Sequence, residues 1–130
     1  MTQQSETRPP DTLSPGHPDT LETIERFNGA FNRHDVDAVM ALMTDDVVFE
    51  NTSPAPDGER YEGQAAVRDF WQQFFASSPE AHFEAEDIVV AADRAVVRWR
   101  YSWGDGHIRG VDVFRVREGK VAEKLSYVKG

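Results

Sequence analysis

The chain has 130 residues, and its 14 basic and 23 acidic side chains give a formal net charge of −9. This length fits a single domain. The acidic balance argues against nucleic acid or an anionic membrane as a partner, because both require a basic surface. The absence of cysteine excludes a disulfide framework, a thiol nucleophile and a thiolate metal site. No apolar run approaches the roughly 20 residues of a membrane span, so the sequence predicts a soluble, cytoplasmic protein.

Residues 1–18 hold four of the seven prolines together with Ser, Thr, Gln and Asp. This composition is typical of a disordered tail, and it lacks the apolar segment of a secretory signal. We therefore expect the folded domain over residues 19–130. Apolar residues at helical spacing predict three helices in its first part: one from Asp19 to about Phe31, a short one after Asp35, and one over about Gln64–Ala76.

The strands are predicted from a different pattern. Val47–Asn51 reads as a first strand, and Thr52–Glu62, which contains two prolines and a glycine, reads as a loop. After the third helix the apolar period changes from 3.6 to 2. This change predicts four strands joined by short turns, over Phe83–Ala91, Ala95–Trp103, Ile108–Arg117 and Val121–Val128. Helices followed by a meander of antiparallel strands predict an α+β fold.

An acid lies inside the third strand of this meander, where Gly110–Val116 otherwise reads as buried. Asp is depleted in strands and is rarely buried without a partner. Apolar surroundings raise the pKa of a carboxyl, which suits proton transfer near neutral pH. Asp112 is therefore the first candidate for a working acid in an apolar pocket. The alternative is a structural ion pair with Arg100 or Arg109.

Three segments together resemble the SnoaL-like branch of the NTF2-like superfamily: Phe31–Phe49 (FNRHDVDAVMALMTDDVVF), Tyr61–Trp71 (YEGQAAVRDFW) and Gly110–Val121 (GVDVFRVREGKV). The resemblance extends over about Leu21–Val128. It implies a cone in which three N-terminal helices pack on a curved, mostly antiparallel sheet and enclose a pocket. It also implies dimers formed through the sheet. The superfamily hosts isomerases, cyclases, epoxide hydrolases and non-catalytic binders, so the resemblance identifies the fold better than the function.

The same resemblance suggests roles for polar residues. Asp112 matches the acid of members that perform acid–base chemistry, such as the ketosteroid isomerases. In those enzymes the base and the oxyanion-hole tyrosine stand where this chain has Asn51 and Phe27, which disfavours steroid isomerisation by that machinery. The alternative role of Asn51 is to cap the turn that follows it. Arg100 matches the arginine of the superfamily's epoxide hydrolases, but the two acids of that mechanism are replaced here by Ser102 and Ser126.

The strand over Ala95–Trp103 has two distinct faces. One face holds Arg98, Arg100 and Ser102, and the other holds Trp99, Tyr101 and Trp103. The family alignment predicts that the arginine side faces the pocket, which leaves the aromatic side on the outside as the interface of a homodimer. Alternation alone favours the other arrangement, in which the aromatic side faces the core and the arginines face the solvent.

These observations predict a protein with a pocket for a small hydrophobic ligand. The candidate catalytic residues are Asp112, Arg100 and Asn51, and the candidate lining residues are Phe27, Phe31, Phe49, Trp71, Phe75, Ser102, Phe114 and Ser126. The four histidines are scattered, and no phosphate-binding loop is present, so we expect neither a metal nor a cofactor. The predicted function is acid–base catalysis of the isomerase, cyclase or hydratase type on a hydrophobic or polyketide-like substrate. The alternative is a non-catalytic dimeric ligand-binding or accessory domain.

Overall fold

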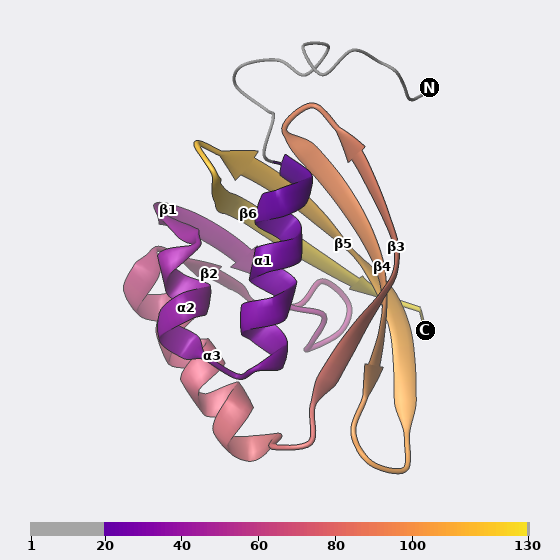
Figure 1. Cartoon of the computed structure of the whole chain (residues 1–130). Coiled ribbons are helices and arrows are strands. Elements are labelled where there is room, and N and C mark those ends of the chain that lie inside the picture. The colour runs from indigo at the N-terminus through magenta and orange to yellow at the C-terminus, as the bar shows by residue number, and fades with distance from the viewer. Residues whose placement is uncertain (1–19, 130) are drawn as a thin grey trace.

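The computed structural model describes residues 20–129. The predicted tail over residues 1–18 lies outside these residues. The described part of the chain forms three helices and six strands in this order (Figure 1): α1 (Thr20–Asn32), α2 (Val36–Ala41), β1 (Met43–Glu50), β2 (Arg60–Glu62), α3 (Gln64–Ser77), β3 (His82–Ala91), β4 (Arg94–Ser102), β5 (His107–Arg117) and β6 (Lys120–Val128).

All six strands belong to one sheet, in the order β2-β1-β6-β5-β4-β3. The β1–β6 pair is parallel, and the other neighbouring pairs are antiparallel. The sheet is curved and carries the helices on one side (Figure 1). On that side α1 contacts β3, β4 and β6, whereas α2 and α3 contact β1. The predicted α+β class is therefore confirmed.

Two details differ from expectation. The three helices implied by the resemblance are present, but α3 follows β1 and β2, in the order of the predicted elements, so the helices are not all N-terminal to the sheet. The predicted loop over Thr52–Glu62 ends in the three-residue strand β2, which pairs with the end of β1 and sets Tyr61 opposite Phe49. Three residues are too few to show an alternating pattern, so this strand is recognisable only from its pairing.

Local sequence explains where the helices begin. Asp35 has an extended backbone, and its carboxylate accepts a hydrogen bond of 3.1 Å from the backbone N–H of Ala38, as an N-cap of α2 should. Gly63 precedes α3 with φ of 89°, a conformation that glycine adopts without strain. These two starts direct α2 and α3 against the same strand, β1, and so fix one wall of the space above the sheet.

The core lies between α1, α3 and the inner face of the sheet. Ile24 and Phe27 of α1, Val67 and Trp71 of α3, and Phe114 of β5 are each at most 2% exposed. Alternate residues of β5 face the core, because Gly110, Asp112, Phe114 and Val116 are all buried on this inner face. The core side of β5 thus brings one carboxylate into an apolar layer.

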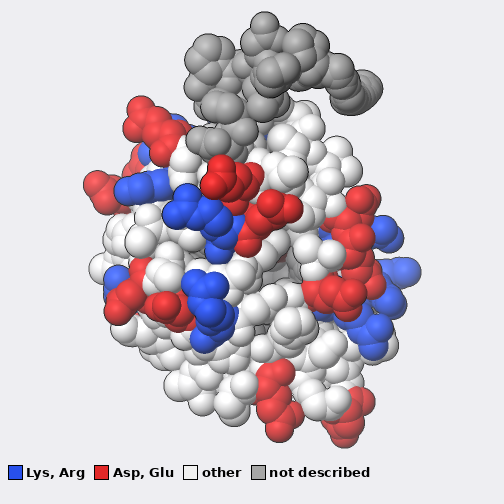
Figure 2. All heavy atoms as spheres, viewed as in Figure 1, with Lys and Arg blue, Asp and Glu red and all other residues white. Residues whose placement is uncertain are grey.

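The surface is charged but mixed. Figure 2 shows acidic and basic side chains next to one another on the viewed face, with uncharged surface between the groups. Among residues 20–129, no helix is both long enough and apolar enough to cross a membrane.

Candidate functional site

A cavity of about 470 Å³ lies between α3, β1 and the inner face of β3–β6. Nine of the eighteen residues that line it are aromatic: Phe31, Phe49, Tyr61, Phe70, Trp71, Phe74, Phe83, Trp99 and Tyr101. The polar lining residues differ in exposure. Ser53, Gln73 and Ser77 are exposed and form part of the rim. Asn51, Thr52 and Ser126 are half-buried, whereas Asp112 and Lys124 are buried. The cavity therefore combines an aromatic wall with one buried pair of opposite charges.

The buried pair is an ion pair between β5 and β6. Lys124 Nζ lies 3.1 Å from Asp112 Oδ2, and each side chain is 8% exposed. Lys124 Nζ also donates a hydrogen bond of 3.1 Å to Ser126 Oγ. Removing two charges from water is costly, and the attraction between them offsets this cost only in part. A pair of this kind within an apolar layer is therefore unlike the exposed ion pairs elsewhere on the sheet.

The strand register explains why these three residues meet. Asp112 on β5 lies opposite Ser126 on β6, and Lys124 lies two residues before Ser126 on the same face. Residues opposite one another in a ladder share a face of the sheet, and alternate residues of a strand do too. The register therefore directs the carboxylate, the ammonium and the hydroxyl to the inner face, where they line the cavity together.

Aromatic rings surround the ammonium group. Lys124 Nζ lies 4.9 Å from the ring centre of Phe49, 5.5 Å from that of Trp71 and 5.9 Å from that of Phe31. A cation within about 6 Å of a ring face is attracted by the electron-rich centre of the ring. The rings thus stabilise Lys124 as a cation, and they fix its position at the wall of the cavity.

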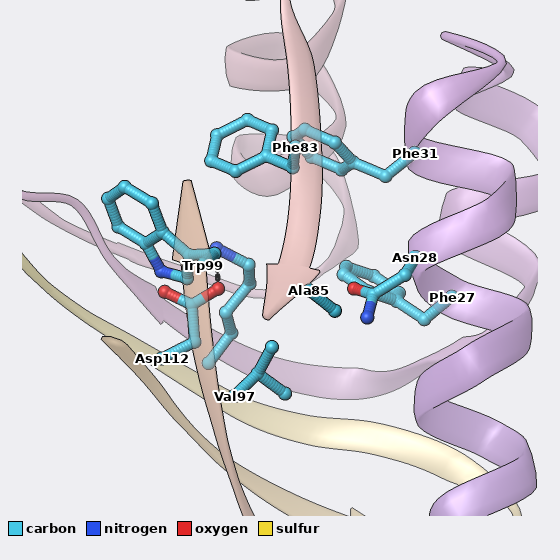
Figure 3. A pocket seen from close by; sticks show the side chains of 9 residues that line it. Phe27, Asn28, Phe31, Phe83, Ala85, Val97, Trp99 and Asp112 are labelled. Atoms are coloured by element: carbon cyan, nitrogen blue, oxygen red, sulfur yellow. Dashed lines mark ion pairs between the residues drawn. The ribbon is translucent and has the colours of Figure 1, made fainter. Parts of the chain in front are cut away.

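A second, smaller cavity of about 20 Å³ lies behind the pair, between α1 and β3–β5 (Figure 3). Asn28 of α1 and Ala85 of β3 line this smaller cavity. Five residues line both cavities: Phe31, Phe83, Trp99, Asp112 and Lys124. The ion pair therefore belongs to the partition between the two spaces.

The expected orientation of β4 is wrong. Val97 lies opposite Asp112, and Trp99 lies opposite Gly110, so both face inward with the carboxylate. Trp99 is 5% exposed, and Tyr101 lines the large cavity. The alignment-based assignment fails because the pairing with β5 fixes which face of β4 is inside. The aromatic stripe is therefore a wall of the pocket over most of its length.

The same register places one candidate catalytic residue and one candidate lining residue outside the site. Arg100 and Ser102 lie on the outer face of β4, opposite Arg109 and His107 of β5. Arg100 Nη2 lies 3.4 Å from His107 Nδ1. Neither residue lines either cavity. The partner of Asp112 is also different from the expected one, since Lys124 pairs with it and Arg109 pairs with Glu86 instead.

The other candidates fall into two groups. Asn51, Ser126, Phe31, Phe49 and Trp71 line the large cavity, although Asn51 Oδ1 also accepts a hydrogen bond of 2.8 Å from the backbone N–H of Thr52. The remaining three are core residues beside it. Phe27 lines the small cavity, Phe114 packs edge-on against Phe27, and Phe75 stacks on His34 with ring centres 4.6 Å apart.

Lys124 is the main residue that the sequence analysis missed. A signal for it was available, because Ser126 was expected to line the pocket and Lys124 shares its strand parity. Tyr61 was missed too, since its strand lies in the predicted loop. Burial in the cavity wall raises the pKa of Tyr61, and its hydrogen bond to Glu59 raises it further, so the phenol stays neutral.

A side-chain bridge holds α1 against β3 at the edge of the cavity. The Asn32 amide donates to the backbone carbonyl of Phe83 at 2.7 Å and accepts from its N–H at 2.8 Å. This double contact fixes Phe83, whose ring lines both cavities. Within residues 20–129, no group of three His, Asp or Glu side chains is arranged to hold a metal ion.

Comparisons with known proteins agree with this architecture. The SnoaL-like domain family matches residues 24–124. An NTF2-like protein of unknown function from Mesorhizobium loti is 42% identical, with a TM-score of 0.78, and the match covers 91% of this chain and 98% of that chain. A comparison with curated proteins gives no match.

More distant structures share the fold. A provisional ketosteroid isomerase from Kribbella flavida has a TM-score of 0.76 at 20% identity, covering 88% of this chain and 80% of that one. A provisional polyketide cyclase from Sinorhizobium meliloti has a TM-score of 0.69 at 18% identity, covering 94% of this chain and 100% of that one. Because the family match spans most of the described residues and the Mesorhizobium protein is similar over nearly its whole length, this chain belongs to the SnoaL-like domain family of the NTF2-like superfamily.

Proposed function

We propose that the large cavity binds a neutral, mostly aromatic ketone and that Asp112 and Lys124 catalyse removal of a proton from the carbon next to its carbonyl. The observation that carries this proposal is the Asp112–Lys124 pair in the wall of an aromatic cavity. This reaction initiates both isomerisations and cyclisations, the activities that the superfamily resemblance suggests. No cofactor takes part.

Each polar residue has a stated role. The carboxylate of Asp112 accepts the proton as general base. The ammonium of Lys124 donates to the carbonyl oxygen, on which negative charge develops. Ser126 Oγ accepts a hydrogen bond from Lys124, so its own O–H is free to donate to the same oxygen. Asn51 lies farther along the wall and provides a polar anchor.

Charge balance favours a neutral ligand over an ionised one. Asp112 already compensates the charge of Lys124, so a carboxylate ligand would add an unpaired negative charge to a desolvated site. With a ketone, the proton moves to Asp112 as the charge moves to the ligand oxygen. The sum of the charges of Asp112, Lys124 and ligand then stays at zero throughout, which avoids the cost of an unpaired buried charge.

The test is deuterium exchange of 2-tetralone, a neutral bicyclic aromatic ketone, followed by NMR in heavy water. Asp112→Asn should lower the catalysed exchange rate by at least about a hundredfold, the low end for a positioned base. Lys124→Met should lower it by about as much, since it removes the donor to the developing oxyanion. The matched control is Arg100→Gln, which changes the neighbouring strand on its outer face and should leave the rate unchanged. Equal rates for the wild type and Asp112→Asn would contradict the proposal.

A second candidate is a binder without catalysis. The pairing of Asp112 with Lys124 favours it, because the carboxylate already has a partner at 3.1 Å and a buried ion pair can be purely structural. In that case 2-tetralone would quench the fluorescence of Trp71 and Trp99, which line the cavity, but exchange would proceed at the rate in buffer. Fluorescence quenching and deuterium exchange, measured on one sample, therefore distinguish a catalyst from a binder.

The homodimer remains a prediction with a smaller interface than expected. Trp99 and Tyr101 face the cavity of the protomer, whereas Trp103 is 39% exposed. Trp103 follows the end of β4, and its ring packs against Tyr101 with ring centres 5.4 Å apart. An interface that includes Trp103 would therefore lie beyond the end of this strand, and it would use Trp103 without its two neighbours. Sedimentation of the wild type and of Trp103→Glu tests this, and a monomeric wild type would refute it.

A further inference from the structure

Lys124 differs from the other two lysines of the chain, because Lys120 and Lys129 are both exposed. Lys124 is buried, and it lines the large cavity. A lysine is seldom buried unless it is paired. The ion pair with Asp112 accounts for its burial, but not for its place in the wall of a cavity. An amine that faces an aromatic cavity is a candidate nucleophile.

Two neighbours prepare Lys124 for reaction with a carbonyl group. Asp112 Oδ2, which lies 3.1 Å from Lys124 Nζ, can take a proton from the ammonium and so free the lone pair of the nitrogen. Ser126 Oγ accepts a hydrogen bond of 3.1 Å from the same nitrogen and orients it. Lysines in apolar pockets are the nucleophiles of enzymes that hold carbonyl substrates as imines. We propose that Lys124 forms an imine with an aldehyde or ketone bound in the large cavity.

The aromatic rings around Lys124 suit the product of this reaction. Their centres lie 4.9 Å from Nζ for Phe49, 5.5 Å for Trp71 and 5.9 Å for Phe31. A protonated imine keeps the positive charge on the same nitrogen, so the attraction to the rings persists after the bond has formed. Asp112 remains the counter-ion. The covalent adduct therefore adds no unpaired charge to the buried site.

The reaction balances with Asp112 as the carrier of two protons. Asp112 takes one proton from the ammonium of Lys124, and the freed lone pair bonds to the carbonyl carbon while the π electrons of the carbonyl move to oxygen. Asp112 returns this proton to that oxygen, which becomes a hydroxyl group. It then takes a second proton from the nitrogen and delivers it to the hydroxyl as the C–O bond breaks. The products are a protonated imine, one water molecule and the Asp112 carboxylate.

The imine rests on the proposed function for the class of its ligand, a carbonyl compound, but not for catalysis. The hydrogen bond from Lys124 to the ligand oxygen brings the nitrogen close to the carbonyl carbon, so the complex of the proposed function precedes the covalent one. In the adduct the positive nitrogen is bonded directly to that carbon. It withdraws electrons from the neighbouring C–H bond more strongly than a hydrogen bond does, and Asp112 is again a carboxylate that can accept the proton.

The first test is reduction with sodium cyanoborohydride in the presence of 2-tetralone, followed by peptide mass spectrometry. Reduction converts an imine into a stable secondary amine, so the label should lie on the peptide that contains Lys124. The exposed Lys120 and Lys129 are internal controls and should carry far less label. Tetralin, which has the two fused rings without the carbonyl, should compete and suppress the label. An unlabelled Lys124, equal labelling of the three lysines, or a label unaffected by tetralin would overturn the proposal.

The second test separates the covalent bond from the positive charge. Lys124→Arg keeps a cation that donates hydrogen bonds, but a guanidinium stays protonated and forms no imine. Hydrolysis of an imine places a water oxygen on the ketone. The wild type should therefore speed the entry of heavy oxygen from labelled water into 2-tetralone, and Lys124→Arg should fall to the rate in buffer. Lys120→Arg, the matched surface change, should keep the wild-type rate.

Circular dichroism shows whether Lys124→Arg is folded, and the trapping experiment on the wild type needs no variant. Oxygen exchange as fast in folded Lys124→Arg as in the wild type would overturn the imine. If 2-tetralone is trapped on Lys124 but the wild type does not exchange its deuterium, the proposed function fails and the imine stands. If deuterium exchanges while neither the label nor oxygen exchange is found, the imine is overturned and the proposed function survives.

Discussion

The strand β5 carries an ion pair on each face of the sheet, and the two differ in surroundings. On the inner face Asp112 pairs with Lys124 at 3.1 Å, and both side chains are 8% exposed. On the outer face Arg109 pairs with Glu86, also at 3.1 Å, but these side chains are 44% and 21% exposed. Equal distances therefore accompany very different exposure to water.

The difference shows which pair calls for a functional explanation. The outer pair forms at the surface, where both groups remain accessible to water, so it adds little to stability and costs little. Buried ion pairs can often be replaced by well-packed apolar residues at no cost in stability. The position of the inner pair in the wall of a cavity therefore supports its proposed role in binding or catalysis.

The largest expected effect comes from breaking the inner pair. Lys124→Met leaves Asp112 as an unpaired buried charge and should lower the free energy of unfolding by about 3–5 kcal/mol. Chemical denaturation measured by circular dichroism tests this. Arg109→Gln, which breaks the outer pair, is the control and should change the denaturation midpoint very little. Equal losses from both variants would remove the distinction between the two faces.

The double variant Asp112→Leu with Lys124→Met sharpens the same comparison. It removes both charges and fills the space with apolar atoms, so it should recover most of the stability that Lys124→Met loses. Ketone exchange should nevertheless remain absent. A double variant that is as unstable as the single one would show that shape, and not the unpaired charge, is responsible.

A smaller effect is expected at Gly110, next to the inner pair. A Cβ there would lie 2.5 Å from Trp99 Cζ2 and 2.2 Å from the carbonyl oxygen of Tyr127. Gly110→Ala should therefore displace the indole and destabilise the fold by about 1–3 kcal/mol, the usual cost of overpacking. Denaturation and tryptophan fluorescence report both changes. If Gly110→Ala leaves the stability unchanged, Trp99 has room to move.

The face assignments show how far sequence reasoning reaches. The alternation in β5 correctly placed Asp112 among buried residues, and the helical periodicity located α1 and α3. The alternation in β4 favoured the arrangement that the structure shows, with the aromatic side toward the core, and the family alignment wrongly reversed it. Both sides of β4 carry large side chains, so the assignment depends on which residue of β4 pairs with Asp112, and pairing is a long-range property.

The same reason explains the missing partner of Asp112. Lys124 comes twelve positions after Asp112 in the sequence. The β5–β6 pairing also changes register between Arg115 and Val116, on the segment of chain that joins them. A lysine in the last strand reads as solvent-exposed by composition alone. Only the combination of parity with Ser126 and the aromatic rings of α1, β1 and α3 makes the buried position evident.

The smallest expected effect concerns the outer pair and pH. Hydrogen bonding to Arg109, with its positive charge, holds the pKa of Glu86 below its ordinary value of 4.5. A carboxyl with a lowered pKa in the folded state stabilises the fold above its ordinary pKa, and this contribution is lost as the pH falls through the lowered value. The difference in melting temperature between the wild type and Glu86→Gln should therefore be small at neutral pH and vanish once the pH has fallen below the lowered pKa of Glu86. A difference that grows on acidification would contradict the assignment.

The bridge from Asn32 to Phe83 has a consequence for association between molecules. The strand β3 is the last in the sheet, and an uncovered last strand offers unpaired N–H and C=O groups on which another chain can add a strand. The Asn32 amide occupies both backbone groups of Phe83 and so imitates a neighbouring strand at that residue. A single side chain of α1 thus protects this stretch of the sheet edge from intermolecular β-pairing and the aggregation that follows from it.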